Sequence, residues 1–250
     1  MTVYAEPVMG SVVSFRFDGQ DAAPAGLTDA ISWLHEVDRR FSPFRPDSEV
    51  TLIADGRLAE SDTHPDVREV LALIDQAAVD SGGAFDARRW RADGRFDPSG
   101  LVKGWAVERS SADLARARGG RFAIDAGGDV VVRSGDPGGH PWRVGIRHPD
   151  RPDRVAAVLS IADGAIATSG GYERGAHIRD PRTGRTPSDV RSMSVVGPDL
   201  TWADTFATAA YVMGRDGLAW VAGHPGYDAL AIGWDDQVTW TRGVDRYLVG

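Results

Sequence analysis

Apolar side chains recur at helical spacing in several stretches of this chain, and these stretches predict its helices. Over residues 26–41 the apolar positions are Leu27, Ala30, Ile31, Leu34, Val37 and Phe41. Over residues 64–80 they are Val67, Val70, Leu71, Ile74 and Ala78. Each set falls on one face of a helix with 3.6 residues per turn, which predicts two amphipathic helices. Three more helices are predicted, from the segment after Pro98 to near Gly119, over 201–213 and over 216–222.

Short apolar runs bounded by glycine, proline and polar residues predict the strands. They lie at residues 8–17, 122–125, 130–132, 142–147, 155–161, 165–168, 193–196, 227–233 and 237–241. Helices and strands do not alternate regularly, as they would in a parallel βαβ fold. The chain is therefore predicted to be α+β, with mixed, largely antiparallel sheets and packed helices. It has no internal repeat, low-complexity run or linker, so residues 1–250 are predicted to form one domain.

Composition narrows the class of protein and its partners. Hydrophobic residues make up 42% of the chain and charged residues 26%, as in ordinary soluble globular proteins. The net charge of −8 argues against nucleic acid as a partner, because a nucleic-acid-binding domain needs a basic surface. The chain has no cysteine, which excludes disulfides and thiolate chemistry. No signal peptide or membrane-spanning apolar run is visible, so we expect a cytoplasmic location without membrane insertion.

Residues 164–187 concentrate groups that a plain loop does not need. A short strand ends at Ser169-Gly170-Gly171, and Asp180 to Gly184 predict a tight turn. Around them lie four arginines, a histidine and two carboxylates, namely Arg174, Arg179, Arg182, Arg185, His177, Glu173 and Asp180. Guanidinium groups and bare backbone N–H groups suit an anion such as a phosphate. A charged, solvated β-hairpin accounts for this stretch equally well.

A second candidate anion site lies where residues 96–104 lead into a predicted helix. The N-terminus of a helix attracts anions through its unpaired N–H groups and its dipole. Lys103 lies in the first turn, where the dipole disfavours a cation, and this placement indicates a negatively charged partner. The spacing does not match the GxxxxGK[ST] phosphate-binding loop.

Asp204 and Thr208 lie four residues apart on the predicted helix over 201–213, so they share one face. Their neighbours are small and apolar, and a carboxylate with a hydroxyl in such surroundings supplies hard oxygen ligands for Mg²⁺. A hydrogen bond between the two side chains is the simpler explanation for this pair alone. The six histidines show no zinc-binding spacing, and Ser169 does not stand in a G-x-S-x-G hydrolase motif.

Taken in order, short motifs from nearly the whole chain resemble the FAD:protein FMN transferase (ApbE-like) family. The matching segments are Met9-Gly10-Ser11, Phe41-Ser42-Pro43-Phe44, Ser48-Glu49-Val50, Gly83 to Asp86, Asp97 to Val107, Ile124 to Asp129, Trp142 to Ile146, Ala167 to Gly170, Tyr172-Glu173-Arg174, His177 to Gly184 and Ala203-Asp204 to Gly214. Each segment is weak by itself, and their order makes the set specific. The resemblance implies a magnesium-dependent enzyme that moves FMN from FAD onto a Thr or Ser hydroxyl of an acceptor protein and releases AMP.

The resemblance also implies roles for individual residues. The Asp204 carboxylate, the Thr208 hydroxyl and the Gly100 backbone carbonyl would bind Mg²⁺. The flavin nucleotide would contact Met9, Phe44, Ala84, Phe85, Asp86, Asp97, Lys103, His177 and Ile178. His177 is our candidate for the general base that takes the proton of the acceptor hydroxyl.

Two loops are shorter than the family pattern. Ten residues separate Asp86 from Asp97, where family members carry a longer insert, and only Gly175 and Ala176 separate Arg174 from His177. Both loops fall near the expected nucleotide pocket and acceptor surface. The alternative functions are an FAD pyrophosphatase that yields FMN and AMP, a non-catalytic FAD-binding protein, and a structural domain with a charged loop.

Overall fold

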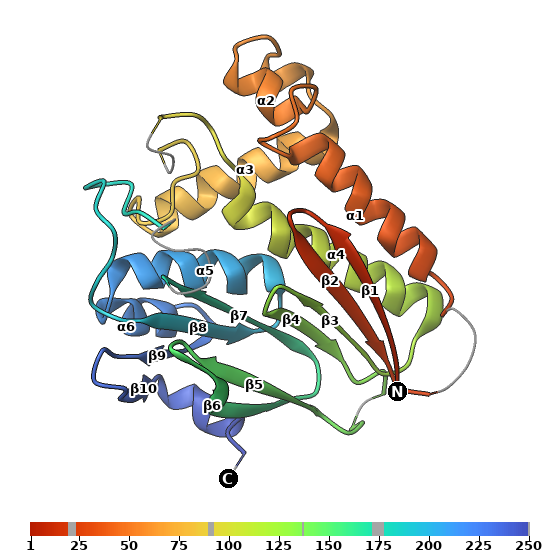
Figure 1. Ribbon diagram of the computed structural model, residues 1–250, viewed down its shortest axis with the longest axis vertical. Coiled ribbons are helices and arrows are strands. Elements are labelled where there is room, and N and C mark those ends of the chain that lie inside the picture. Colours follow the sequence, from red (N-terminus) through yellow and green to blue (C-terminus); the bar gives the residue numbers. More distant parts are fainter. Residues whose placement is uncertain (20–23, 90–92, 137, 172–177, 250) are drawn as a thin grey trace.

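The computed structural model describes residues 1–19, 24–89, 93–136, 138–171 and 178–249 (Figure 1). It confirms the predicted α+β class, with helices packed on antiparallel sheets. The strands of the large sheet, in spatial order, are β1 (Thr2–Val8), β2 (Ser11–Phe17), β3 (Phe122–Ala126), β4 (Asp129–Arg133), β7 (Gly164–Gly170), β8 (Ser192–Gly197), β9 (Asp228–Ile232) and β10 (Val238–Trp240). All neighbouring strands in it run antiparallel.

The first hairpin differs from the single strand that the sequence pattern predicts over residues 8–17. Val8 pairs with Ser11, so Met9 and Gly10 form a two-residue turn between β1 and β2. Both turn residues have positive φ, 54° for Met9 and 65° for Gly10. That conformation is easy for glycine and unfavourable for methionine. Pro7 interrupts the apolar pattern of β1, and it is tolerated because β1 lies at the edge of the sheet.

Helices cover one face of the large sheet (Figure 1). α1 (Leu27–Phe41), α4 (Ser99–Arg118) and α5 (Leu200–Met213) each contact its strands, and all three confirm predicted helices. The remaining helical segments are α2 (Glu49–Ala54), α3 (Pro65–Asp80), α6 (Asp216–Ala222), η1 (Glu60–Asp62) and η2 (Arg242–Arg246). Within the described ranges, every helix is too short or too polar to traverse a bilayer.

The other face of the sheet is covered over only part of its width. A separate hairpin of β5 (Trp142–His148) and β6 (Arg151–Ile161) packs there with η2 and forms a second hydrophobic core. The sheet contributes Val132 and Ile166 to that core, and the hairpin contributes Ile146 and Leu159 among others. Towards β1 and β2 the cover ends, and Val3 and Val12 are 56% and 54% exposed.

Gly104 is a point of close approach between α4 and α5. A Cβ atom at this position would lie 2.7 Å from the Leu200 carbonyl oxygen and 3.0 Å from the Asp204 Cβ atom. A side chain at Gly104 would therefore push the two helices apart. The contact holds the beginnings of α4 and α5 together, and both carry predicted site residues.

Gly104→Val is expected to lower the free energy of unfolding by about 2 kcal/mol, because the added atoms overpack this helix contact. Chemical denaturation measures the change. Arg116→Ala, at an exposed position of the same helix, is the control and should alter the free energy by less than about 0.5 kcal/mol. Equal stabilities of the two variants would contradict the close helix contact.

Candidate functional site

Two tight turns and the end of β7 meet at one end of the large sheet. The first turn is Met9-Gly10, and the second is Gly127-Gly128 between β3 and β4. A Cβ atom on Gly127 would lie 2.7 Å from Ser11 Oγ, so the two hairpins touch. Beyond the second turn, the Thr168 N–H of β7 donates to Asp129 Oδ1 at 2.9 Å. This end of the sheet organises the candidate site.

The N-terminus of α4 is held in place from two sides. Asp97 Oδ1 accepts hydrogen bonds from the Ser99 N–H at 3.0 Å and from the Ser99 hydroxyl at 2.5 Å. The Phe85 ring lies beneath Gly100, 3.2 Å from the place where a Cβ atom would stand. Ala84 and Phe85 are fully buried, so they support the first turn of α4 from the core.

Lys103 lies between two buried carboxylates. Its ammonium nitrogen forms an ion pair with Asp129 Oδ2 and lies 3.7 Å from Asp204 Oδ2. Asp129 and Asp204 are 2% and 5% exposed, whereas 30% of the Lys103 side chain is exposed. The three side chains come from α4, β4 and α5. One ammonium therefore faces two carboxylates. Because Lys103 is the most exposed of the three side chains, solvent and ligands reach the cluster from its side.

Burial raises the pKa of Asp204 to about 7, because a low-dielectric environment disfavours the charged form of a carboxyl group. The Lys103 ammonium opposes this shift, and the nearby Asp129 carboxylate adds to it. Asp204 Oδ2 accepts no hydrogen bond from the described residues. A second cation beside this oxygen, in addition to the Lys103 ammonium 3.7 Å away, would favour the ionised carboxylate.

Thr208 adds a hydroxyl oxygen one helical turn after Asp204. It is 4% exposed, and its Oγ1 shares a hydrogen bond with Ser169 Oγ at 3.0 Å. Gly100 lies one turn before Gly104 on α4, and a Cβ atom at Gly100 would meet the Phe85 ring. The convergence of its carbonyl oxygen with Asp204 and Thr208 on a metal ion stays a prediction.

These donors fit magnesium better than a metal that needs a cage of protein ligands. In the described ranges no group of three or more His, Asp or Glu side chains could hold a metal ion. Magnesium usually binds one or two carboxylates and takes its other ligands from water and phosphate oxygens. A buried, unsatisfied carboxylate oxygen with a hydroxyl nearby meets that requirement.

A cavity of about 250 Å³ adjoins Lys103 on the helix side of the sheet end. The Met9-Gly10 turn, the end of α1 with the segment through Phe44, and the first turns of α4 form its walls. Phe44 is 86% exposed, so its ring faces are accessible. An accessible aromatic ring, a thioether and an ammonium suit a nucleotide, whose ring stacks on aromatic groups and whose phosphates attract cations.

The structure brings five of the predicted site residues together. Met9, Phe44 and Lys103 line the cavity, Asp204 of α5 lies beside Lys103, and Thr208 follows Asp204 by one helical turn. Asp97 borders the same cavity through Ser99, which is one of its lining residues.

Four other predicted flavin contacts do not line the cavity, namely Ala84, Phe85, Asp86 and Ile178. Ile178 is buried in the main core, and Asp86 Oδ1 accepts a hydrogen bond from the Arg88 N–H at 2.9 Å. His177, the candidate general base, lies outside the described residues. The individual contacts of all these residues with a flavin nucleotide stay predictions.

Two arginines of the 164–187 stretch are engaged within their own turn. Arg179 donates from Nε and Nη2 to the Gly184 carbonyl oxygen at 3.0 and 2.7 Å. Arg182 donates from its backbone N–H and from Nε to Asp180 Oδ1, both at 2.9 Å. For these two arginines the structure favours the interpretation that they stabilise a solvated hairpin over the interpretation that they bind a phosphate.

Asp129 and Ser169 are site residues to which the sequence analysis assigns no role. Asp129 stands directly before three valines in β4, where a charged side chain has no packing function. This contrast between residue types could have identified Asp129 from the sequence as a candidate site residue. Ser169 gives no such signal, because its contact with Thr208 exists only once β7 has packed against α5.

Asp129→Asn is expected to lower the free energy of unfolding by about 2 kcal/mol, because it removes one partner of a largely buried ion pair. The amide oxygen of asparagine can still accept the hydrogen bond from the Thr168 N–H. The loss of stability therefore measures the missing ion pair with Lys103. The free energies of unfolding of the unaltered protein, Asp129→Asn, Lys103→Met and the double variant, measured with denaturant, form a double-mutant cycle. We expect a coupling of at least about 1 kcal/mol, and additive single effects would contradict the ion pair.

Comparisons with known proteins agree with this architecture. The model of the ApbE family matches residues 9–92 and 88–231. An FAD:protein FMN transferase of Rhodobacter capsulatus is 37% identical over 144 residues, which are 54% of this chain and 27% of that protein. An FAD:protein FMN transferase of Treponema pallidum is 33% identical over 212 residues, which are 77% of this chain and 58% of that protein. The matched regions thus span less than two thirds of these relatives.

A solved structure shows the same fold along the whole chain. The crystal structure of the ApbE protein from Thermotoga maritima superposes with a TM-score of 0.86 and 21% sequence identity, covering 100% of this chain and 99% of that one. The family model accounts for most of the residues, including the turn at Met9, the α4 N-terminus and Asp204. The chain belongs to the ApbE family.

Proposed function

We propose that this chain is a magnesium-dependent FAD:protein FMN transferase, which moves FMN from FAD onto a Thr or Ser hydroxyl of an acceptor protein and releases AMP. The observation that carries the proposal is the Lys103–Asp129–Asp204 cluster beside a cavity lined by Met9 and Phe44. Family membership and the names of the relatives from Rhodobacter capsulatus and Treponema pallidum support it.

In this proposal each residue of the cluster has a separate task. The Asp204 carboxylate, the Thr208 hydroxyl and the Gly100 carbonyl hold Mg²⁺, which supplies electrophilic stabilisation of the phosphate oxygens when it is bound. Lys103 directs its ammonium towards the pyrophosphate, and Asp129 fixes the position of that ammonium. The Phe44 ring stacks on a flat ring of the nucleotide.

The proposed transfer is a phosphoryl-type displacement. The acceptor hydroxyl oxygen forms a bond to the phosphorus on the riboflavin side of FAD. The bond from that phosphorus to the bridging oxygen of the pyrophosphate breaks, and AMP leaves with the bridging oxygen and its electron pair. A general base takes the hydroxyl proton, and His177 remains our candidate for this role. If water replaces the hydroxyl, the same groups give the pyrophosphatase products FMN and AMP.

Asp204→Ala is expected to reduce Mg²⁺-dependent release of AMP from FAD at least 100-fold, because it removes the only carboxylate of the proposed metal site. Chromatographic quantification of AMP, with and without a chelator, measures this loss. Calorimetric titration with Mn²⁺ provides a readout that does not depend on turnover. Undiminished metal binding or AMP release in Asp204→Ala would contradict the assignment.

Phe44→Ala is expected to raise the KM for FAD about tenfold with a smaller effect on kcat, because a stacking contact is worth about 1 to 3 kcal/mol. Steady-state kinetics with varied FAD measure both constants. Val79→Ala, at another highly exposed apolar position that lies on α3, is the control and should leave KM unchanged. A Phe44→Ala variant that matches this control would exclude stacking on Phe44.

A further inference from the structure

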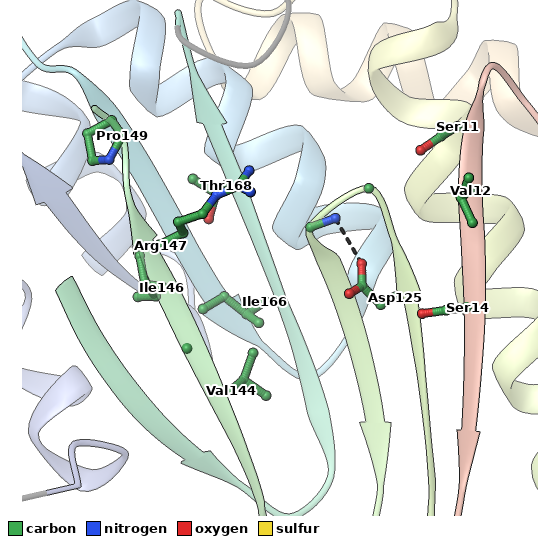
Figure 2. Close-up of a pocket in the computed structure, with 13 residues that line it drawn as sticks. Ser11, Val12, Ser14, Asp125, Val144, Ile146, Arg147, Pro149, Ile166 and Thr168 are labelled. Atoms are coloured by element: carbon green, nitrogen blue, oxygen red, sulfur yellow. Dashed lines mark hydrogen bonds between the residues drawn. The ribbon is translucent and has the colours of Figure 1, made fainter. Parts of the chain in front are cut away.

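A second and larger cleft lies on the face of the sheet that the helices do not cover. Its volume is about 820 Å³, within the size range of ligand-binding sites. Figure 2 shows Ser11, Val12 and Ser14 on one side of it and Val144, Ile146 and Arg147 on the other. Asp125, Ile166 and Thr168 lie between these two sides (Figure 2). None of these side chains is assigned a contact with the flavin nucleotide or the metal ion above.

The wall that β5 contributes is the edge of a strand. Residues 144–147 line the cleft consecutively, although neighbouring side chains of a strand point to opposite faces. The cleft therefore follows the backbone of β5 and not one of its faces. In the described part of the chain β5 pairs only with β6, and no β6 residue lines the cleft. The cleft thus runs along the unpaired edge of β5.

An unpaired strand edge offers a regular row of backbone N–H and C=O groups. The group that matches such a row is another extended backbone, which adds to the edge as a strand. The rest of the lining suits alternating side chains, because hydroxyl groups of Ser11 and Ser14 stand beside apolar Val12 and Ile166. A flavin nucleotide lacks a repeating series of donors and acceptors and would leave this edge unsatisfied.

The cleft also reaches the candidate site along two paths. Thr168 lines the cleft, and its N–H donates to Asp129, which pairs with Lys103. Ser11 lines the cleft as well, and the preceding Met9-Gly10 turn lines the cavity beside Lys103. Arg147 of β5 lines the same cleft as Thr168 (Figure 2). A chain lying along β5 would therefore pass close to the Lys103 cluster.

We propose that this cleft binds an extended segment of the acceptor protein as a strand added to the unpaired edge of β5. The bound segment presents its Thr or Ser hydroxyl to the Lys103 end of the cleft. This inference rests on the proposed transferase function and adds to it the site and the conformation in which the acceptor is recognised. Backbone pairing supplies affinity, and the pockets around Ser14 and Ile166 select side chains.

The test uses a displayed library of peptides about twelve residues long, each with a central threonine or serine. Peptides that become fluorescent with covalent flavin in the presence of FAD, Mg²⁺ and the intact protein are selected. Ser14→Trp and Val12→Trp both fill the cleft from the β2 side, and Val12 is the more exposed of the two positions. Val3→Trp, also exposed but outside the cleft lining, is the matched control.

We expect both cleft variants to label the selected peptides at least tenfold more slowly, with the control within twofold of the unaltered protein. FAD affinity, measured by fluorescence titration, and the unfolding midpoint are determined for all variants. Labelling of the peptides by both cleft variants at the control rate would overturn the proposal and leave the transferase function standing. Weaker FAD binding by both cleft variants would also overturn it, because the cleft would then belong to the flavin.

Two further outcomes are informative. Release of AMP without labelling of any peptide would overturn the transferase function and the acceptor site together, in favour of the pyrophosphatase. The unaltered protein could also prove to be a dimer whose cleft variants sediment as monomers and still label peptides. That result would overturn the proposal, because the cleft would then bind a second copy of the chain.

Hydrogen exchange tests the strand addition itself. A selected peptide whose hydroxyl residue is replaced by alanine should slow amide exchange about tenfold at those residues of β5 within 144–146 whose N–H groups point away from β6, because these amides then donate to the peptide. Exposed amides of β1, at the edge of the large sheet, should be unaffected. Protection confined to the floor of the cleft, without the β5 edge, would contradict pairing to β5.

Discussion

The interaction on which the site depends is the contact of one lysine with two buried carboxylates. A buried carboxylate is unfavourable by several kcal/mol unless a partner compensates it, and here Lys103 partners both Asp129 and Asp204. The three residues lie on α4, β4 and α5, so the contact fixes two helices and the sheet relative to one another. Because two carboxyl groups share one ammonium, a metal ion beside Asp204 would add the positive charge that favours the ionised form of both.

The backbone makes this arrangement possible at a few specific positions. Gly104 lets α4 approach α5 closely enough for Lys103 and Asp204 to lie on adjoining helix faces. The Gly127-Gly128 turn directs the chain back so that Asp129 begins β4 beside Thr168. The left-handed conformation of Met9 places it at the tip of the first hairpin, next to the cavity. Close approach and unusual φ values are therefore concentrated where the chemistry is proposed.

The parts of the fold that the sequence predicts are those controlled by local periodicity. α1 and α3 follow from the spacing of their apolar residues, and β3 and β4 follow from short apolar runs around a glycine pair. The hairpin turn at Met9 is missed when residues 8–17 are taken as one strand, although the buried positions change from even numbers in β1 to odd numbers in β2 across the turn.

The same limit applies to the site. Asp204 and Thr208 are recognisable because they share one helix face, whereas Ser169 and the unpaired edge of β5 depend on contacts between distant segments. Arginine density is misleading for a related reason, since Arg179 and Arg182 are satisfied by carbonyl and carboxylate oxygens of their own turn. Residue type indicates which chemistry is available, and only the packing shows which groups remain available for a ligand.

The two cavities together constrain how a transfer reaction could proceed. The cavity with Phe44 lies on the helix side of the sheet end, and the cleft along β5 lies on the opposite face. In a phosphoryl-type displacement the attacking and leaving oxygens stand roughly in line on opposite sides of the phosphorus. A donor held on one face and an acceptor strand on the other would approach the Lys103 cluster from opposite directions and meet that requirement. The two cavities approach each other at this end of the sheet, where Ser11 lines the cleft and the adjoining Met9-Gly10 turn lines the cavity.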